Sequence, residues 1–165
     1  MADLCTVPNL KARLGITDSA DDVMLSTIII AVSQAITDLT GRRFYATTET
    51  RYYQAQSPYR LDVDDLLTIT TLKTDEDGDR TYETTWAATD YDLEPYNAAL
   101  ESRPYDRISV APLGRYYFPT WAKGVQIAGS FGYAATAPTP IVEIALLASE
   151  QFYKRKDAIL GTTGA

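Results

Sequence analysis

The sequence predicts an α+β protein: a small helical bundle with a β-rich insertion between its long helix and its C-terminal helix. Apolar residues recur at helical spacing within residues 6–41 and again within 139–158. Between them, residues 43–133 hold short segments rich in Thr, Tyr, Val and Ile, separated by Pro and Gly, and this pattern favours strands. We therefore expect a single domain over residues 1–165, with a helical core, an insertion and a C-terminal tail at 159–165.

The ends of the first two helices are predicted from their capping signals. Thr6 can cap a short helix that has Pro8 in its first turn, and Gly15 is expected to end it. For the second helix we expect Ser19 as the cap and Gly41 directly after the last residue. The apolar stripe of this helix is formed by Leu25, Ile28, Ile29, Val32, Ile36 and Leu39, and it is widened by Met24, Ala31 and Ala35.

The insertion is predicted to contain five or six short strands. The candidates are residues 50–54, 66–73, 82–86, 91–93, 107–110 and 124–130. The acidic run Asp75–Asp79 predicts a turn that joins the second and third of these strands as a hairpin. Whether the strands form a sandwich or a barrel stays open at this point.

The C-terminal helix carries more apolar surface than one small core needs. Thr139 is its predicted cap and Pro140 lies in its first turn. One apolar face holds Ile141, Ile144, Ala145, Ala148 and Phe152, and an adjacent second face holds Val142, Leu146 and Tyr153. Only a strip of Glu143, Glu150 and Lys154 is polar, and the last two are spaced as an i,i+4 ion pair.

Two interpretations of this helix stay open. Either both apolar faces pack inside the chain, or the second face contacts another subunit, since large exposed apolar patches mark association. The basic run at residues 154–156 either complements the helix macrodipole or contacts an acidic partner. For a contact with another subunit or another protein, the candidate interface residues are Val142, Leu146, Tyr153, Lys154, Arg155, Lys156, Ile159 and Leu160.

Composition disfavours several classes of function. The chain has no histidine, which is the commonest general acid–base residue and the commonest zinc ligand, so hydrolases and metalloenzymes are disfavoured. Its formal net charge of −7 disfavours a protein that grips nucleic acid. A single cysteine, Cys5, excludes an intrachain disulfide and suits a reducing cytoplasm. The apolar run Ile28–Val32 is far shorter than a membrane span, so we expect no membrane contact.

Two further patterns have competing interpretations. The acidic residues Asp75, Asp77 and Asp79 alternate as in a calcium loop, but the glycine comes two places early and Trp86 stands where a bidentate Glu is needed. A hairpin turn is the better interpretation, and we expect no metal site.

The chain has twelve tyrosines, and the doublets Tyr52-Tyr53 and Tyr116-Tyr117 can pack across strands, form a protein interface, or bind a ligand such as a glycan.

The order of these elements resembles the head–tail connector (adaptor) proteins of long-tailed bacteriophages. The residues that carry the resemblance are Leu10–Ile16, Val32–Phe44, Asp90–Pro95, Val125–Tyr133 and Ile141–Asp157, so it spans nearly the whole chain. The β insertion is long for the more compact members, which puts in doubt which surfaces would meet the tail.

The resemblance implies a structural virion protein that is made in the host cytoplasm and has no catalytic residue, metal or cofactor. It implies a ring of about a dozen copies that binds the portal, extends the DNA channel and presents a platform to the next neck or tail protein. DNA would pass without specific binding, which the negative net charge also favours. The alternatives are another neck component, such as a stopper or a tail-terminator-like protein, and a β-rich glycan-binding module.

Overall fold

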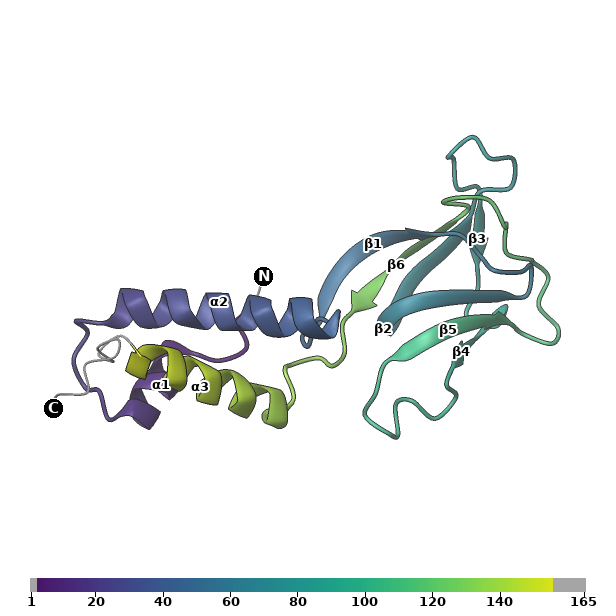
Figure 1. Ribbon diagram of the computed structural model, residues 1–165. Coiled ribbons are helices and arrows are strands. Elements are labelled where there is room, and N and C mark those ends of the chain that lie inside the picture. The colour runs from purple at the N-terminus through teal and green to yellow at the C-terminus, as the bar shows by residue number, and fades with distance from the viewer. Residues whose placement is uncertain (1–2, 156–165) are drawn as a thin grey trace, which may run out of the picture. The chain divides into compact units, whose positions relative to one another are not determined.

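The computed structural model describes residues 3–155, which fall into two compact units (Figure 1). The helical unit combines the N-terminal residues up to Arg42 with the residues from Ala137 onward. The β unit consists of residues 43–136. The protein therefore mixes helices with an antiparallel sheet, and the predicted α+β class is confirmed.

The helical unit contains three helices, α1 (Val7–Leu14), α2 (Asp22–Thr40) and α3 (Thr139–Lys154). The Thr6 side chain caps α1 by accepting a hydrogen bond from the backbone N–H of Asn9. Gly15 and Gly41 follow α1 and α2 in the left-handed conformation, with φ of 72° and 65°. These three end signals are confirmed, because glycine adopts this conformation without the penalty that a Cβ brings.

Two predicted caps are wrong. Helix α2 begins three residues after Ser19, because residues before it form a turn in which the Asp18 carboxylate accepts from the N–H of Ala20. Its cap position is Asp21, whose side chain makes no capping hydrogen bond. In α3, Pro138 stands at the cap position and Thr139 is already helical, so no side chain caps this end.

The core of the helical unit lies where α1, α2 and α3 meet. Its buried apolar side chains are Leu4, Cys5, Leu10, Leu25, Ile29, Val32, Ala145 and Leu146. Arg13 of α1 fastens α3 through ion pairs to Glu143 at 2.9 Å and Glu150 at 2.8 Å. Glu150 also pairs with Lys154 at 2.6 Å, as the i,i+4 spacing predicted.

The β unit is one six-stranded antiparallel sheet. Its strands are β1 (Thr47–Tyr53), β2 (Arg60–Thr74), β3 (Thr84–Trp86), β4 (Tyr91–Glu94), β5 (Tyr105–Val110) and β6 (Val125–Phe131). The order is β1-β6-β2-β5-β4, and β3 pairs with the end of β2. The predicted hairpin is confirmed, since Leu72 of β2 lies opposite Trp86 of β3.

Strand β2 is much longer than predicted and is irregular. It starts at Arg60, pairs with β5 through its first half and with β6 through its second half, and its register shifts in both pairings. Gly129 of β6 lies at one of these shifts, where a Cβ would come within 2.2 Å of the Thr68 carbonyl oxygen. Only a glycine allows the two backbones to approach so closely.

The β unit has a continuous apolar core on one face of its sheet. The core consists of Ala55, Leu61, Leu66, Leu72, Trp86, Ile108, Phe118, Val125, Ile127 and Phe131. Alternate residues of β6 are buried, which is the period expected of a strand with one face in the core. Phe118 comes from the loop between β5 and β6, and its ring stacks on Trp86 with centroids 4.5 Å apart.

Candidate functional site

An apolar surface of the helical unit lies along one side of α2 and the adjoining side of α3. We call this surface the apolar flank. On α2, Met24, Ile28, Ala31, Ala35 and Leu39 follow one another at spacings of three and four residues, which places them on one side of the helix. On α3, Ile144, Ala148 and Phe152 share one side in the same way.

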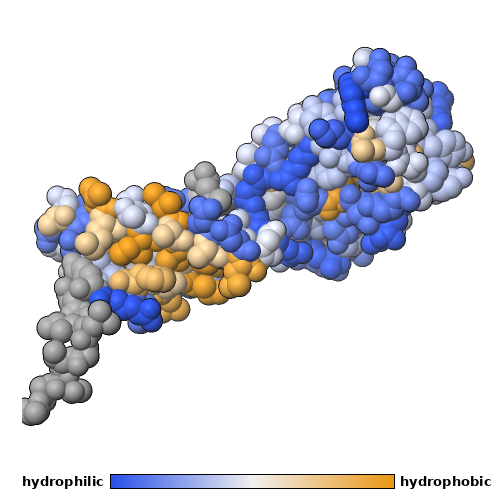
Figure 2. Space-filling model, turned by 45° about the horizontal axis from the view of Figure 1, so that its top comes forward, coloured by the Kyte–Doolittle hydropathy of each residue, from blue (hydrophilic) through white to orange (hydrophobic). Residues whose placement is uncertain are grey.

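The two helices form a shallow groove within the apolar flank. The groove has a volume of about 240 Å³ and is lined by Ile28, Ala31, Val32, Ala35, Ile36, Leu39, Ala148 and Phe152, all of which are apolar. Leu39 is 89% exposed and Phe152 is 56% exposed. Figure 2 shows apolar side chains gathered over the helices, whereas the β unit shows a mostly hydrophilic face in the same view.

The packing of α2 explains why this flank is left open. Leu25, Ile29 and Val32 of α2 point into the core of the helical unit and are buried. The apolar stripe of α2 is wider than the surface that α1 and α3 cover, so its neighbouring residues reach water. An uninterrupted apolar surface of this kind typically marks a contact with another protein.

Length and mean hydropathy alone would also allow α2 to cross a membrane, with a value of 1.6 over its most apolar window. The short apolar run Ile28–Val32, in contrast, predicted no membrane span. Two features favour a packed helix over a membrane span. One side of α2 lies in the protein core, and the opposite side carries the exposed polar residues Thr27, Gln34 and Asp38, which would be costly in lipid.

The structure distinguishes the two predicted apolar faces of α3. Leu146 is buried in the core, and Val142 and Tyr153 are half-buried on the same side. The Tyr153 hydroxyl donates a hydrogen bond to the Asp21 carboxylate at the start of α2. The exposed large apolar side chains of α3 are instead Ile144, Leu147 and Phe152. A contact of Val142, Leu146 and Tyr153 with another subunit stays a prediction, and in this chain they serve the internal packing.

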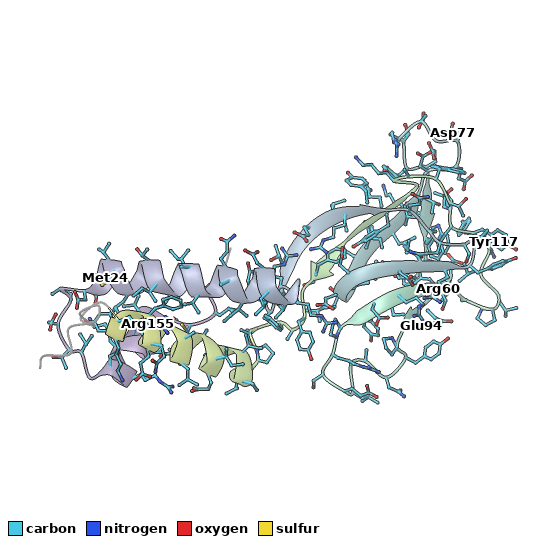
Figure 3. The ribbon with its side chains drawn as sticks, viewed as in Figure 1. Met24, Arg60, Asp77, Glu94, Tyr117 and Arg155 are labelled. Atoms are coloured by element: carbon cyan, nitrogen blue, oxygen red, sulfur yellow. The ribbon has the colours of Figure 1, made fainter. Side chains whose placement is uncertain are left out.

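The basic end of α3 is exposed. Lys154 pairs with Glu150, and the guanidinium of Arg155 lies over the Phe152 ring, 5.9 Å from its centroid. Figure 3 labels Arg155 at the C-terminal end of α3. Arg155 therefore borders the apolar flank. Lys156, Ile159 and Leu160, which were also predicted to form the interface, lie outside the residues that the structure describes.

The four tyrosines predicted in the insertion do not form one surface. Tyr52 is exposed and its ring lies 5.7 Å from that of Tyr82, whereas Tyr53 points to the other face of β1 and donates to the Asp64 carboxylate. Burial raises the pKa of Tyr53, and the nearby negative charge of Asp64 raises it further. Tyr116 and Tyr117 lie in the loop before β6, where Tyr116 packs on Trp86 and Tyr117 packs on Tyr59.

The acidic loop between β2 and β3 is the predicted turn. Asp75, Asp77, Asp79 and Glu83 place carboxylate oxygens within 4.8 Å of one another, and Glu83 was not foreseen. Asp75 is buried, and the backbone N–H groups of Gly78 and Arg80 donate to its carboxylate. Burial alone would raise the pKa of Asp75, but these hydrogen bonds outweigh it and hold the pKa below its usual value. The carboxylate that anchors the cluster is thus already satisfied within the loop.

Cys5 offers little nucleophilic chemistry. The thiol is buried in the helical unit, and burial raises its pKa, although the neighbouring Ser149 hydroxyl partly opposes the shift. A thiol with a raised pKa stays protonated near neutral pH, and the protonated form is a poor nucleophile. The position of Cys5 is therefore that of a core residue.

The residues that sequence reasoning did not assign to a site are those of α2. The signal was present, since Met24, Ala31 and Ala35 widen the stripe, but the pattern alone does not say which part of a wide stripe neighbouring helices will cover. Tyr59 and Trp121, which lie beside Tyr117, were also not singled out, because each is a lone aromatic residue in an irregular segment.

One family of known proteins matches this chain. The model of the family described as phage gp6-like head-tail connector protein matches residues 5–96, which is more than half of the chain. The matched region contains α1, α2 and the first four strands. Among curated proteins no match is found.

Proposed function

Because the chain belongs to the family of phage gp6-like head–tail connector proteins, we propose that it forms an oligomeric ring in the neck of the phage particle. In this proposal one side of the ring binds the portal of the head and the other side receives the next neck or tail protein. The family is one of structural proteins at the head–tail junction and not a family of enzymes.

The observation that carries the proposal is the apolar flank. Exposure of Leu39 and Phe152 to water is unfavourable for a monomer. Each large apolar side chain that leaves water contributes roughly 1.5–3 kcal/mol of favourable free energy. Ring formation needs a surface on each copy that meets a different surface on the next copy. The apolar flank supplies one such surface, and Arg155 at its border adds a charged group that can orient the contact.

The net charge of the chain favours a ring that encloses DNA over a protein that binds DNA tightly. The net charge is −7, and binding to phosphates would need clustered cations. A ring with an acidic balance lets DNA move through its centre without sticking. The extended DNA channel in this proposal follows from the ring and from this charge together.

Introducing a charge into the apolar flank tests the proposal. We expect Leu39→Asp to fold normally, since Leu39 is almost fully exposed, but to lose assembly with purified portal at least about tenfold. The matched control is Leu113→Asp in the β unit, where the leucine is 95% exposed and lies outside the apolar flank. Sedimentation and electron microscopy of the mixture would report the copy number and the position of the chain.

Two results would contradict the proposal. One is a wild-type chain that stays monomeric and ignores the portal, and the other is a Leu39→Asp variant that assembles as well as the control. If the chain instead occupied a layer that does not touch the portal, it would be a stopper or a tail-terminator-like protein.

A further inference from the structure

The loop between β5 and β6, together with the connection between β1 and β2, builds a second surface of the β unit. We call it the aromatic shelf, and it consists of Pro58, Tyr59, Arg115, Tyr117, Pro119 and Trp121. It encloses a shallow hollow of about 630 Å³. Its three aromatic side chains are unusually open to water, with exposed fractions of 62% for Tyr59, 59% for Tyr117 and 41% for Trp121. Figure 3 shows Tyr117 pointing outward from the β unit.

The shelf is held rigidly from below. Phe118 lies between the exposed residues in sequence, is buried, and stacks on Trp86 with an interplanar angle of 12°. Its N–H donates to the Pro58 carbonyl at 2.8 Å, and the Gln54 side chain donates to the Thr120 carbonyl at 2.9 Å. The exposed rings therefore stand on an ordered base, which lowers the entropic cost of binding a ligand.

The polar groups of the shelf are mainly unused hydrogen-bond donors. Within residues 3–155, no hydrogen bond is made by the phenols of Tyr59 and Tyr117 or by the indole N–H of Trp121. The guanidinium of Arg115 likewise has no hydrogen-bond or ion-pair partner in the described chain. A ligand that complements the indole N–H and the guanidinium must offer acceptors, whereas the two phenols can either donate or accept.

The geometry of the rings argues against a flat sugar-binding platform. The rings of Tyr59 and Tyr117 meet at 88° with centroids 5.4 Å apart, so they form an angled pair.

We propose that the aromatic shelf binds a proline-containing segment of another protein in the polyproline II conformation. Such a segment has no internal hydrogen bonds, its carbonyls are free acceptors, and each proline lacks an N–H. Its proline rings can pack against the exposed faces of aromatic side chains, and aromatic-lined grooves are the usual receptors for this conformation. The preformed helix also brings little conformational entropy to lose. The proposal concerns the single chain and does not depend on ring formation.

An oligoproline peptide provides the direct test. The probe is an acetylated and amidated nonaproline, added to the full chain at up to millimolar concentration. The chain has two tryptophans, Trp86 and Trp121, and only Trp121 is exposed, so its fluorescence should change saturably. We expect Tyr117→Ala to weaken binding by at least about tenfold, measured in parallel by calorimetry. Tyr117→Phe, which removes only the donor, should weaken it a few-fold.

Matched controls make the result specific. Tyr96→Ala removes a tyrosine that is also exposed in the β unit but lies outside the shelf, and it should leave binding unchanged. A glycine–serine peptide of equal length should not bind. Each variant must keep the thermal midpoint of the wild type.

Three outcomes would overturn the proposal. The first is the absence of saturable nonaproline binding, and the second is binding that survives both Tyr117→Ala and Tyr59→Ala. The third is Tyr117-dependent binding of chitohexaose without binding of nonaproline, which would identify a glycan site.

Discussion

The two units of this protein differ in how completely they cover their own apolar residues. The β unit buries a continuous core, and its exposed aromatic residues are tyrosines and a tryptophan that carry a polar group. The helical unit buries a smaller core and leaves Met24, Leu39, Ile144 and Phe152 in water. In the β unit, one face of the sheet and the loops that cross it enclose the core. In the helical unit, the three helices leave the apolar flank uncovered.

This difference suggests a division of roles. A unit with a closed core needs nothing further to be stable, so its outer surface can present defined contacts such as the aromatic shelf. A unit with an open apolar flank gains stability when a second protein covers it. We infer that the helical unit is the part whose stability depends most on assembly.

The largest effect is expected in the core of the β unit. Phe131→Ala removes a fully buried ring that packs beside Tyr53 and lies under the guanidinium of Arg51. We expect a loss of about 3–5 kcal/mol in the free energy of unfolding, because the deletion leaves a cavity. Denaturant unfolding followed by tryptophan fluorescence reports on this unit, since both tryptophans lie in it. The control Leu113→Ala should change the free energy by less than about 0.5 kcal/mol.

An intermediate effect is expected from two adjacent leucines of α3. Leu146 is buried and Leu147 is about half exposed, so Leu146→Ala should cost about 2–4 kcal/mol and Leu147→Ala less than about 1 kcal/mol. Unfolding followed by circular dichroism at 222 nm would measure both. Equal losses would mean that the two sides of α3 are covered alike, and the contrast between core side and exposed side would then be lost.

The smallest effect is expected from mild acid, and it should fall more on the β unit. Four of its carboxyl groups have a pKa below the usual value: Glu49, Asp62, Asp75 and Glu94. In the helical unit the one such carboxyl resolved among the described residues is Glu150, held by hydrogen bonds from Lys154 and Arg13. Hydrogen bonds from Arg43 to Glu49 and from the Ser109 side chain to Glu94 are the leading causes in the β unit.

The direction of these pKa shifts determines whether stability rises or falls with pH. A carboxyl whose pKa is lowered by folding stabilises the folded state above its unfolded pKa, which is about 4. That contribution is lost as the pH falls from there through the lowered pKa. Between pH 6 and pH 3 the fluorescence-detected thermal midpoint should therefore drop by a few degrees more than the midpoint detected by circular dichroism. Glu94→Gln should reduce this difference, whereas the exposed Asp106→Asn should leave it in place.

Most of the fold was predictable from local signals. Thr6, Gly15 and Gly41 mark helix ends because capping involves only a few neighbouring residues. The hairpin through Asp75–Asp79 was predictable for the same reason. Ser19 and Thr139 were wrong as caps because hydroxyl residues occur in many helix starts, and the turn that precedes each helix decides which residue is used. The second half of β2 was predicted, but its first half was missed because Asp62, Asp64 and Asp65 interrupt the apolar pattern.

The candidate sites were less predictable than the fold. The sequence by itself determined that α2 carries a wide apolar stripe and that α3 carries more apolar surface than a small core requires, because helical periodicity is a local property. Only the tertiary structure decided which part of that surface is free. In the folded chain Leu146 points into the core, whereas Leu39 and Phe152 stay exposed. Which side of α2 and of α3 is covered depends on where the other helices of the unit pack. In the same way, only the folded chain brings Tyr59, which is far away in sequence, to the hollow that Tyr117 and Trp121 also line.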